Sequence, residues 1–149
     1  ERGVSATFNS VSNSGEFNAR YTTVANGADP GSLSPEIPEL DFQLPGQLAQ
    51  VWNLTFDGAF DGPATLEFHY DPDLLAPGVD EQTLEMRHFE DGEWHALAST
   101  VEPTRNIIRV ETDNFSPFAL GAVPEPSTLS LFGLAGILGL RRPRRHRTA

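Results

Sequence analysis

Apolar and polar residues alternate with a period of two in several segments of this chain, and this pattern restricts its fold more than any other feature. The apolar positions are Trp52, Leu54 and Phe56; Leu66, Phe68 and Tyr70; Leu84 and Met86; Ile108 and Val110. Because successive side chains of a strand point to opposite faces of a sheet, such alternation is typical of strands with one buried face. The body of the chain shows no convincing helical period. The sequence therefore predicts an all-β fold.

Residues that favour turns separate these segments. They are Asp57-Gly58, Asp61-Gly62-Pro63, Asp71-Pro72, Pro77-Gly78 and Asp91-Gly92. Short strands with turns between them, within roughly 120 residues, predict an antiparallel β-sandwich. The chain contains no cysteine, which excludes disulfides, thiolate metal sites and cysteine nucleophiles. The fold must therefore be stabilised by its core.

The sequence divides into four parts. Residues 29–45 contain several prolines and acidic residues that interrupt any periodicity, so they are predicted to be a Pro-rich linker or a long loop. Residues 46–121 are the expected β-sandwich module. Residues 1–28 hold two polar strand candidates, which are expected to end a missing or larger domain or to add edge strands to the sandwich. Residues 122–149 form a C-terminal tail.

The best-defined local prediction is a β-hairpin around Asp91-Gly92. A type I′ turn at these two residues sets the register of the flanking strands. The predicted pairs are Glu90 with Glu93, Phe89 with Trp94, His88 with His95, and Met86 with Leu97. The two glutamates repel each other, and a three-residue loop would separate them while shifting the register by one residue.

Two groups of polar residues are candidate metal ligands. His88 and His95 face each other in the predicted hairpin, and a carboxylate from Glu90 or Glu93 would complete a zinc-type ligand set. A solvated histidine pair at a hairpin end is the favoured alternative. Oxygen ligands for calcium could come from the aspartates near predicted turns, Asp57, Asp61, Asp71, Asp73 and Asp80. They do not match the EF-hand spacing, so we interpret them as turn-forming residues and expect no metal.

The aromatic residues Trp52, Trp94 and Tyr70 could form a platform for sugar rings. Core packing is the favoured alternative, because aromatic residues at alternating positions are usually buried. Trp52 and Tyr70 lie in segments with this alternation.

The pattern of strands and aromatic residues resembles a recurrent extracellular bacterial β-sandwich module and, more distantly, the GAIN-type sandwiches of eukaryotic receptors. The latter resemblance implies a possible self-cleavage at a His-x-Ser/Thr step. Here the corresponding residues are Asn114-Phe115-Ser116, and asparagine cannot accept the serine proton. Ser116 is instead expected to bond backbone groups, with Phe115 and Phe118 packed inside.

Signatures of catalysis and of cofactor binding are missing from the sequence. It contains no nucleophilic elbow, phosphate-binding loop or dinucleotide fingerprint. The chain is therefore predicted not to be an enzyme, with no catalytic residues and no cofactor.

The tail combines an extended peptide, an apolar segment and a basic cluster. Pro124 and Pro126 keep the peptide extended and accessible. The apolar residues are Leu129, Leu131, Phe132, Leu134, Ile137, Leu138 and Leu140, and the basic residues are Arg141, Arg142, Arg144, Arg145 and Arg147. The apolar segment is shorter than the roughly 17–25 residues of a membrane span. A buried core helix or a hairpin is therefore an alternative.

Charge is distributed unevenly between the body and the tail. Without the residues from Val123 onward, five arginines face twenty acidic residues, a net charge of about −15. Such a body repels nucleic acid and anionic lipids. Arginines beside an apolar segment stay on the cytoplasmic side, so the acidic body is expected to be translocated. Binding of nucleic acid by the basic tail is the disfavoured alternative, since the tail has no aromatic residue that could stack on bases beside its arginines.

The order Val123-Pro124-Glu125-Pro126, apolar segment and arginines resembles the PEP-CTERM sorting signal of exported bacterial proteins. The resemblance implies a short, helical transmembrane segment, a transient stay in the inner membrane, and processing by an exosortase. It then implies a place at the cell surface or in an extracellular polysaccharide matrix. Residues 1–10 lack the features of a secretory signal peptide, so the chain is expected to be a mature form or a fragment without its beginning.

Two alternatives for the body remain open. One is a surface module that binds glycan or calcium, and the other is the C-terminal stalk of a larger secreted enzyme.

Overall fold

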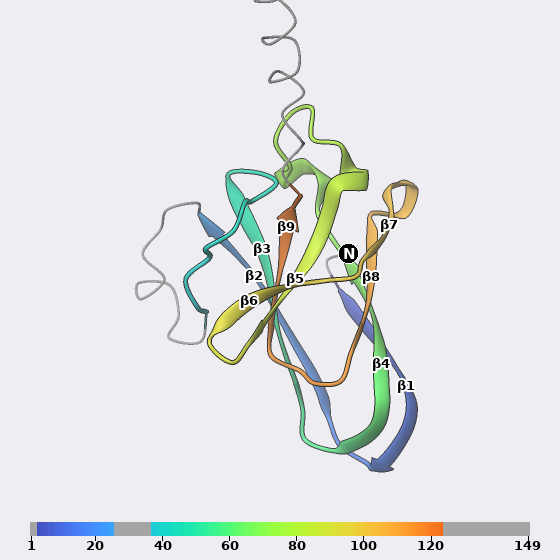
Figure 1. Cartoon of the computed structure of the whole chain (residues 1–149). Helices are drawn as coiled ribbons and strands as arrows, with labels where there is room; N and C mark the ends of the chain where they lie inside the picture. Colours follow the sequence, from blue (N-terminus) through green and yellow to red (C-terminus); the bar gives the residue numbers. More distant parts are fainter. Residues whose placement is uncertain (1–2, 26–36, 124–149) are drawn as a thin grey trace, which may run out of the picture.

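The computed structural model describes residues 3–25 and 37–123, and these residues form a β-sandwich (Figure 1). Its strands are β1 (Val4–Asn13), β2 (Phe17–Ala25), β3 (Leu48–Phe56), β4 (Ala59–His69), β5 (Leu84–Glu90), β6 (Glu93–Leu97), β7 (Thr100–Glu102), β8 (Ile107–Thr112) and β9 (Pro117–Ala122). Three short 3-10 helices connect them: η1 (Pro72–Leu74), η2 (Glu81–Thr83) and η3 (Pro103–Arg105).

The strands form two sheets in which all neighbours are antiparallel. One sheet has the order β1-β4-β8-β7 and the other has the order β2-β3-β9-β5-β6. The β1–β2 and β3–β4 connections each pass from one sheet to the other. The prediction of an antiparallel β-sandwich is confirmed.

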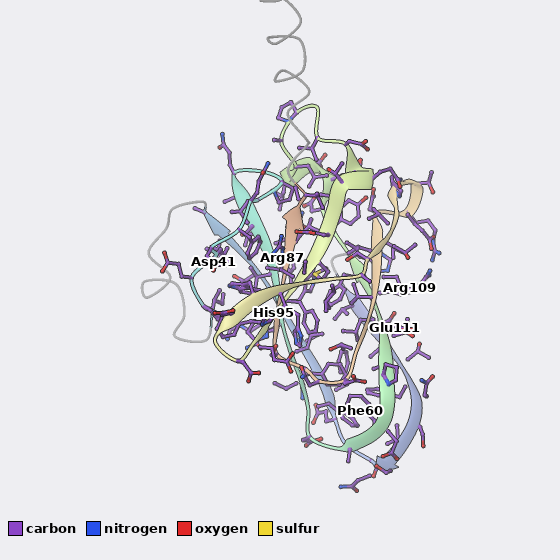
Figure 2. All side chains as sticks on the ribbon, viewed as in Figure 1. Asp41, Phe60, Arg87, His95, Arg109 and Glu111 are labelled. Atoms are coloured by element: carbon purple, nitrogen blue, oxygen red, sulfur yellow. The ribbon has the colours of Figure 1, made fainter. Side chains whose placement is uncertain are left out.

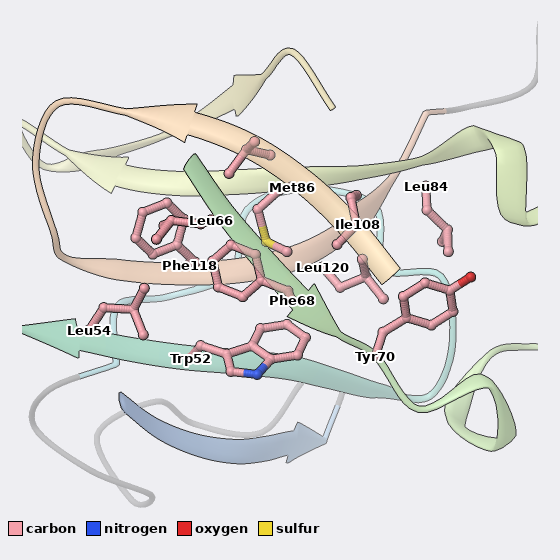
Figure 3. Close-up of a cluster of buried hydrophobic side chains, with 11 residues drawn as sticks. Trp52, Leu54, Leu66, Phe68, Tyr70, Leu84, Met86, Ile108, Phe118 and Leu120 are labelled. Carbon is pink, nitrogen blue, oxygen red and sulfur yellow. The ribbon is translucent and has the colours of Figure 1, made fainter. Parts of the chain in front are cut away.

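The core lies between the sheets and is made by the alternating residues that the sequence singles out (Figure 3). Its buried members are Trp52, Leu54, Leu66, Phe68, Tyr70, Leu84, Met86, Ile108, Val110, Phe118 and Leu120. They come from both sheets, so burial of their apolar surface holds the two sheets together. Phe56 is half-buried and lies in a different cluster.

The two polar N-terminal strands belong to this sandwich. β1 pairs with β4 from Val4 opposite Phe68 onward, and β2 pairs with β3 from Phe17 opposite Phe56 onward. They are therefore the edge strands that the sequence analysis gave as the second alternative. The first alternative, the end of a separate domain, is wrong for residues 4–25. The many polar residues reflect the exposed positions of edge strands.

Residues 37–45 pack against the outer face of the five-stranded sheet. The apolar side chains in this contact are Ile37, Leu40, Phe42 and Leu44, which lie over a cluster of Val24, Ala49, Val51, Trp94 and Ala119. The indole Nε1 of Trp94 donates a hydrogen bond to the carbonyl oxygen of Glu39, at 2.8 Å. This part of the predicted linker is thus a long loop that covers the sheet, and the sandwich module begins well before residue 46. Residues 26–36 lie outside the described residues.

The predicted hairpin of β5 and β6 has the predicted register. All four pairs are observed, from Glu90 opposite Glu93 to Met86 opposite Leu97. Asp91 and Gly92 have φ angles of 52° and 89°, as a type I′ turn requires. The rings of Phe89 and Trp94 lie 5.3 Å apart on one face. The turn chemistry outweighs the repulsion between the two glutamates, whose side chains are exposed to solvent.

A second aromatic cluster closes the end of the sandwich where the β1–β2 and β3–β4 connections lie. It consists of Phe8, Phe17, Phe56, Phe60 and Phe115, with ring centroids of contacting pairs 4.9 to 6.5 Å apart. Gly58 sits at the same end, where a Cβ atom would lie only 2.4 Å from the carbonyl oxygen of Asn13. The two connections can therefore pack together only if this position lacks a side chain. Phe60 marks this end of the body (Figure 2).

Candidate functional site

The strand that leads into the tail is the central strand of the five-stranded sheet. β9 lies between β3 and β5, and it stops at the end of the body opposite to Phe60 (Figures 1 and 2). The amide of Ala122 donates a hydrogen bond to the carbonyl oxygen of Gln43, at 3.0 Å. The amide of Val123 donates to the carbonyl oxygen of Thr83, at 2.9 Å. The backbone is thus held in place as far as Val123.

Val123 is the first residue of the predicted sorting signal, and this residue is 48% exposed. The other predicted sorting residues, Pro124, Glu125 and Pro126, lie outside the described residues. The same holds for the apolar segment from Leu129 to Leu140 and for the arginines from Arg141 to Arg147. In residues 3–25 and 37–123, no helix is both long enough and apolar enough to cross a membrane.

A shallow hollow of about 300 Å³ surrounds the point where the backbone leaves the sheet. It is lined by Gln43, Leu44, Pro45, Ala76, Pro77, Gly78, Val79, Asp80, Thr83, Ala122 and Val123. We call these residues the exit rim. They come from the loop before β3, from the loop between η1 and η2 together with η2 itself, and from the end of β9. The rim could not be predicted from the sequence, because its parts are distant in sequence and share no pattern.

Hydrogen bonds of the backbone fix the shape of the exit rim. The amide of Ala76 donates to the carbonyl oxygen of Pro45, at 2.8 Å, and the amide of Val79 donates to the carbonyl oxygen of Ala76, at 3.2 Å. The carboxylate of Asp80 accepts a hydrogen bond from the amide of Gln82, at 2.9 Å, and so caps η2. The rim is therefore an ordered surface.

The five aspartates considered for calcium binding are divided between the two ends of the body. Asp57 and Asp61 lie near the β3–β4 connection, whereas Asp71, Asp73 and Asp80 lie near η1 and η2. Asp57, Asp71 and Asp80 each accept a hydrogen bond from a backbone amide. Asp71 and Asp80 make these bonds locally, as the N-caps of η1 and η2, in agreement with their interpretation as turn-forming residues, whereas Asp61 lies within β4. Within the described ranges, no three histidine, aspartate or glutamate side chains converge on a common point.

The two histidines of the hairpin lie in different environments. His88 is 3% exposed, and its ring stacks on Phe118 with a centroid distance of 4.3 Å. His95 is opposite it in register but is exposed. The favoured prediction of a solvated pair is therefore wrong for His88. The Nε2 atom of His88 is buried and has no hydrogen-bond partner among the described residues.

Burial of His88 predicts a loss of stability in acid. Desolvation lowers the pKa of this imidazole below its usual value of 6.5, although the nearby Glu90 acts in the opposite direction. The unfolded chain then binds the proton more readily than the folded chain. The contribution of neutral His88 to the free energy of unfolding should be fully present above pH 6.5. It should be lost as the pH decreases from 6.5 through the lower pKa of the folded state. Urea unfolding at pH 8, 7, 6 and 5 measures this.

A phenylalanine at position 88 should reduce the dependence on pH, because the ring can still stack on Phe118 but cannot bind a proton. The control is His95→Gln, which removes an exposed histidine and should keep the dependence of the wild type. Equal dependence on pH in H88F and the wild type would contradict this assignment.

The three aromatic residues considered for sugar binding are buried. Trp52, Tyr70 and Trp94 are 1%, 3% and 7% exposed. They cannot form an exposed platform, and the favoured prediction of core packing is confirmed. The hydroxyl of Tyr70 donates a hydrogen bond to the carboxylate of Glu81, and burial together with this bond raises the pKa of Tyr70.

Ser116 has the structural role that the sequence analysis expected. Its hydroxyl donates a hydrogen bond to the carbonyl oxygen of Phe89. Asn114, which occupies the position of a base in self-cleaving sandwiches, donates to Glu90 instead. Phe118 is buried and Phe115 is half-buried in the second aromatic cluster. Ser116 therefore links the start of β9 to β5.

Comparison with known proteins identifies the C-terminal region. Residues 122–145 match the PEP-CTERM protein-sorting motif, so the match begins at the last residue of β9. The chain matches no curated protein and no solved structure. The motif implies an exported protein that passes the membrane, is processed by an exosortase and reaches the cell surface.

Proposed function

We propose that this chain is a bacterial surface or extracellular-matrix protein whose tail holds it in the inner membrane until an exosortase cleaves it near Pro124-Glu125-Pro126. The apolar segment would be a transmembrane helix, and the arginines would stay in the cytoplasm. The β-sandwich would be released to the cell surface or to the exopolysaccharide as a non-catalytic module.

One observation carries this proposal: the matched motif starts where the last core strand ends. The last described strand of the sandwich ends at Ala122, the residue at which the matched motif begins, so no spacer separates them. A folded body with a net charge of about −15 is thus joined directly to a short apolar segment and five arginines. This order of charges favours a body outside the membrane and a basic end inside the cell.

The polar residues of the body support a non-catalytic role. The hydroxyl of Ser116 and the carboxylates of Asp71 and Asp80 are engaged in hydrogen bonds that hold loops and strands. His88 is buried in the core and stacks on Phe118. These side chains therefore have structural partners that explain their positions.

Processing in cells tests the proposal. The protein is expressed with an internal epitope tag in strains with and without the exosortase, the cells are fractionated, and the C-terminal mass is measured. We expect a shortened, surface-located form in the first strain and an intact, membrane-located form in the second. An intact C-terminus in both strains would contradict the proposal.

A pair of variants links this processing to the motif. The double substitution Pro124→Ala and Pro126→Ala should block the shortening, because the peptide loses its fixed extended backbone. Pro103→Ala, which changes a proline of η3, is the matched control and should be processed like the wild type.

A further inference from the structure

The distance between the exit rim and the sorting motif is limited by the covalent chain. The backbone is fixed as far as Val123, and an extended residue spans at most about 3.3–3.6 Å. Pro126 therefore lies within about 10 Å of the rim, and Leu129, the first residue of the apolar segment, lies within about 20 Å. An enzyme that acts on the motif must work in the narrow space between the rim and the membrane.

The distance of at most about 20 Å between the exit rim and the apolar segment is smaller than the diameter of a small domain, about 30 Å. An enzyme bound to the motif therefore has to touch the rim as well. From this constraint we propose that the exit rim is a docking surface for the exosortase, which contacts the rim whenever it engages the motif. This inference rests on the proposed function. It adds that recognition extends from the motif onto the folded sandwich.

The chemistry of the exit rim suits such a contact. Ala76 and Pro77 are exposed, Val79 is half-buried, and Val123 is one of two large hydrophobic residues that are exposed in the described part of the chain. Asp80 is the one charged residue in the lining of the hollow. An apolar patch on an otherwise acidic body is the kind of surface that a protein partner covers.

The hydrogen bonds that hold the exit rim also favour docking of the enzyme over local unfolding of β9. To give the enzyme more free chain, β9 would have to leave the sheet at its end, breaking the bonds of Ala122 and Val123 to Gln43 and Thr83. Further release would lift Leu120, which is fully buried, out of the core. A contact with the fixed rim requires neither step, and its rigid backbone lowers the entropic cost of binding.

A charge placed in the exit rim tests this inference. Ala76→Glu puts a carboxylate on an exposed alanine of the exit rim, and Ala59→Glu puts one on another exposed alanine at the opposite end of the body. Processing of the full-length protein is followed over time in the strain that contains the exosortase. We expect A76E to be processed at least about fivefold more slowly than the wild type, because a buried, unpaired charge weakens an interface. A59E should match the wild type.

A spacer separates docking from other effects of the substitution. A Gly-Ser insertion of about eight residues between Ala122 and Val123 leaves the sorting motif Val123-Pro124-Glu125-Pro126 intact and adds up to about 27 Å of reach. In this background A76E and A59E should be processed at the same rate, whereas a folding defect of A76E would persist.

Equal processing of A76E and A59E without the spacer would overturn the inference while leaving the proposed function intact. A difference that persists with the spacer would also overturn it. If the wild type itself is not processed, the proposed function fails instead.

Discussion

Ending the chain after Ser116 is expected to abolish folding, whereas ending it after Val123 is expected to leave a body that unfolds cooperatively. The seven residues between these points comprise β9 and Val123. β9 pairs with β3 on one side and with β5 on the other, so its loss divides the five-stranded sheet. It also carries Phe118 and Leu120, both fully buried.

The expected loss of stability follows from the two buried side chains that β9 contributes to the core. Truncating a buried Phe costs about 3–5 kcal/mol and a buried Leu about 2–5 kcal/mol. Their sum approaches the total stability of a typical domain, about 5–15 kcal/mol. Circular dichroism during heating measures the outcome, with the full-length chain in detergent as the reference. A chain ending at Val123 that fails to fold would show that the tail belongs to the core, and it would contradict the proposed function as well.

Replacing Gln50 with alanine is expected to destabilise the body by about 2–4 kcal/mol. Gln50 is 1% exposed and lies on β3, on the same face as Trp52. Its Nε2 donates a hydrogen bond to the carbonyl oxygen of Asp71, at 2.9 Å, and its Oε1 accepts one from the amide of Asp71, at 2.7 Å. Asp71 follows β4, so this side chain connects the two sheets near the exit rim.

Two further variants separate the causes of this loss. Gln50→Met keeps most of the volume but removes both hydrogen bonds to Asp71 and the one from Tyr21, so it should recover only the part of the loss that is due to the cavity. Gln47→Ala changes an exposed glutamine just before β3 and should alter stability by no more than about 0.5 kcal/mol. Urea unfolding at pH 7 measures all three variants. A Q50A protein as stable as Q47A would show that the link between the sheets is dispensable.

The local pattern of the sequence was sufficient to predict the strands of the central core. Leu66 and Phe68 on β4, and Tyr70 directly after it, are buried on one face because alternation reflects the geometry of a single extended segment. The β5–β6 hairpin was predicted to the residue for a similar reason, since Asp91-Gly92 determines both the turn and the register. These features depend on neighbours in sequence.

The position of the N-terminal strands and of residues 37–45 could not be predicted with the same certainty. Leu40, Phe42 and Leu44 also alternate, but their neighbouring prolines and acidic residues favoured a linker. Their burial depends on the outer face of a sheet whose strands lie elsewhere in the chain. His88 was misjudged for the same reason, because Phe118, which covers it, is thirty residues away.

The sequence determined the sorting motif by itself, since Val123-Pro124-Glu125-Pro126, the apolar segment and the arginines are contiguous and act as a linear signal. It also determined the all-β class and the inner core. Only the tertiary structure decided that β9 is a central strand and that an ordered, largely apolar rim surrounds Val123. The physical reason is that the rim joins three segments far apart in sequence, and hydrogen bonds and burial across the whole sandwich bring them together.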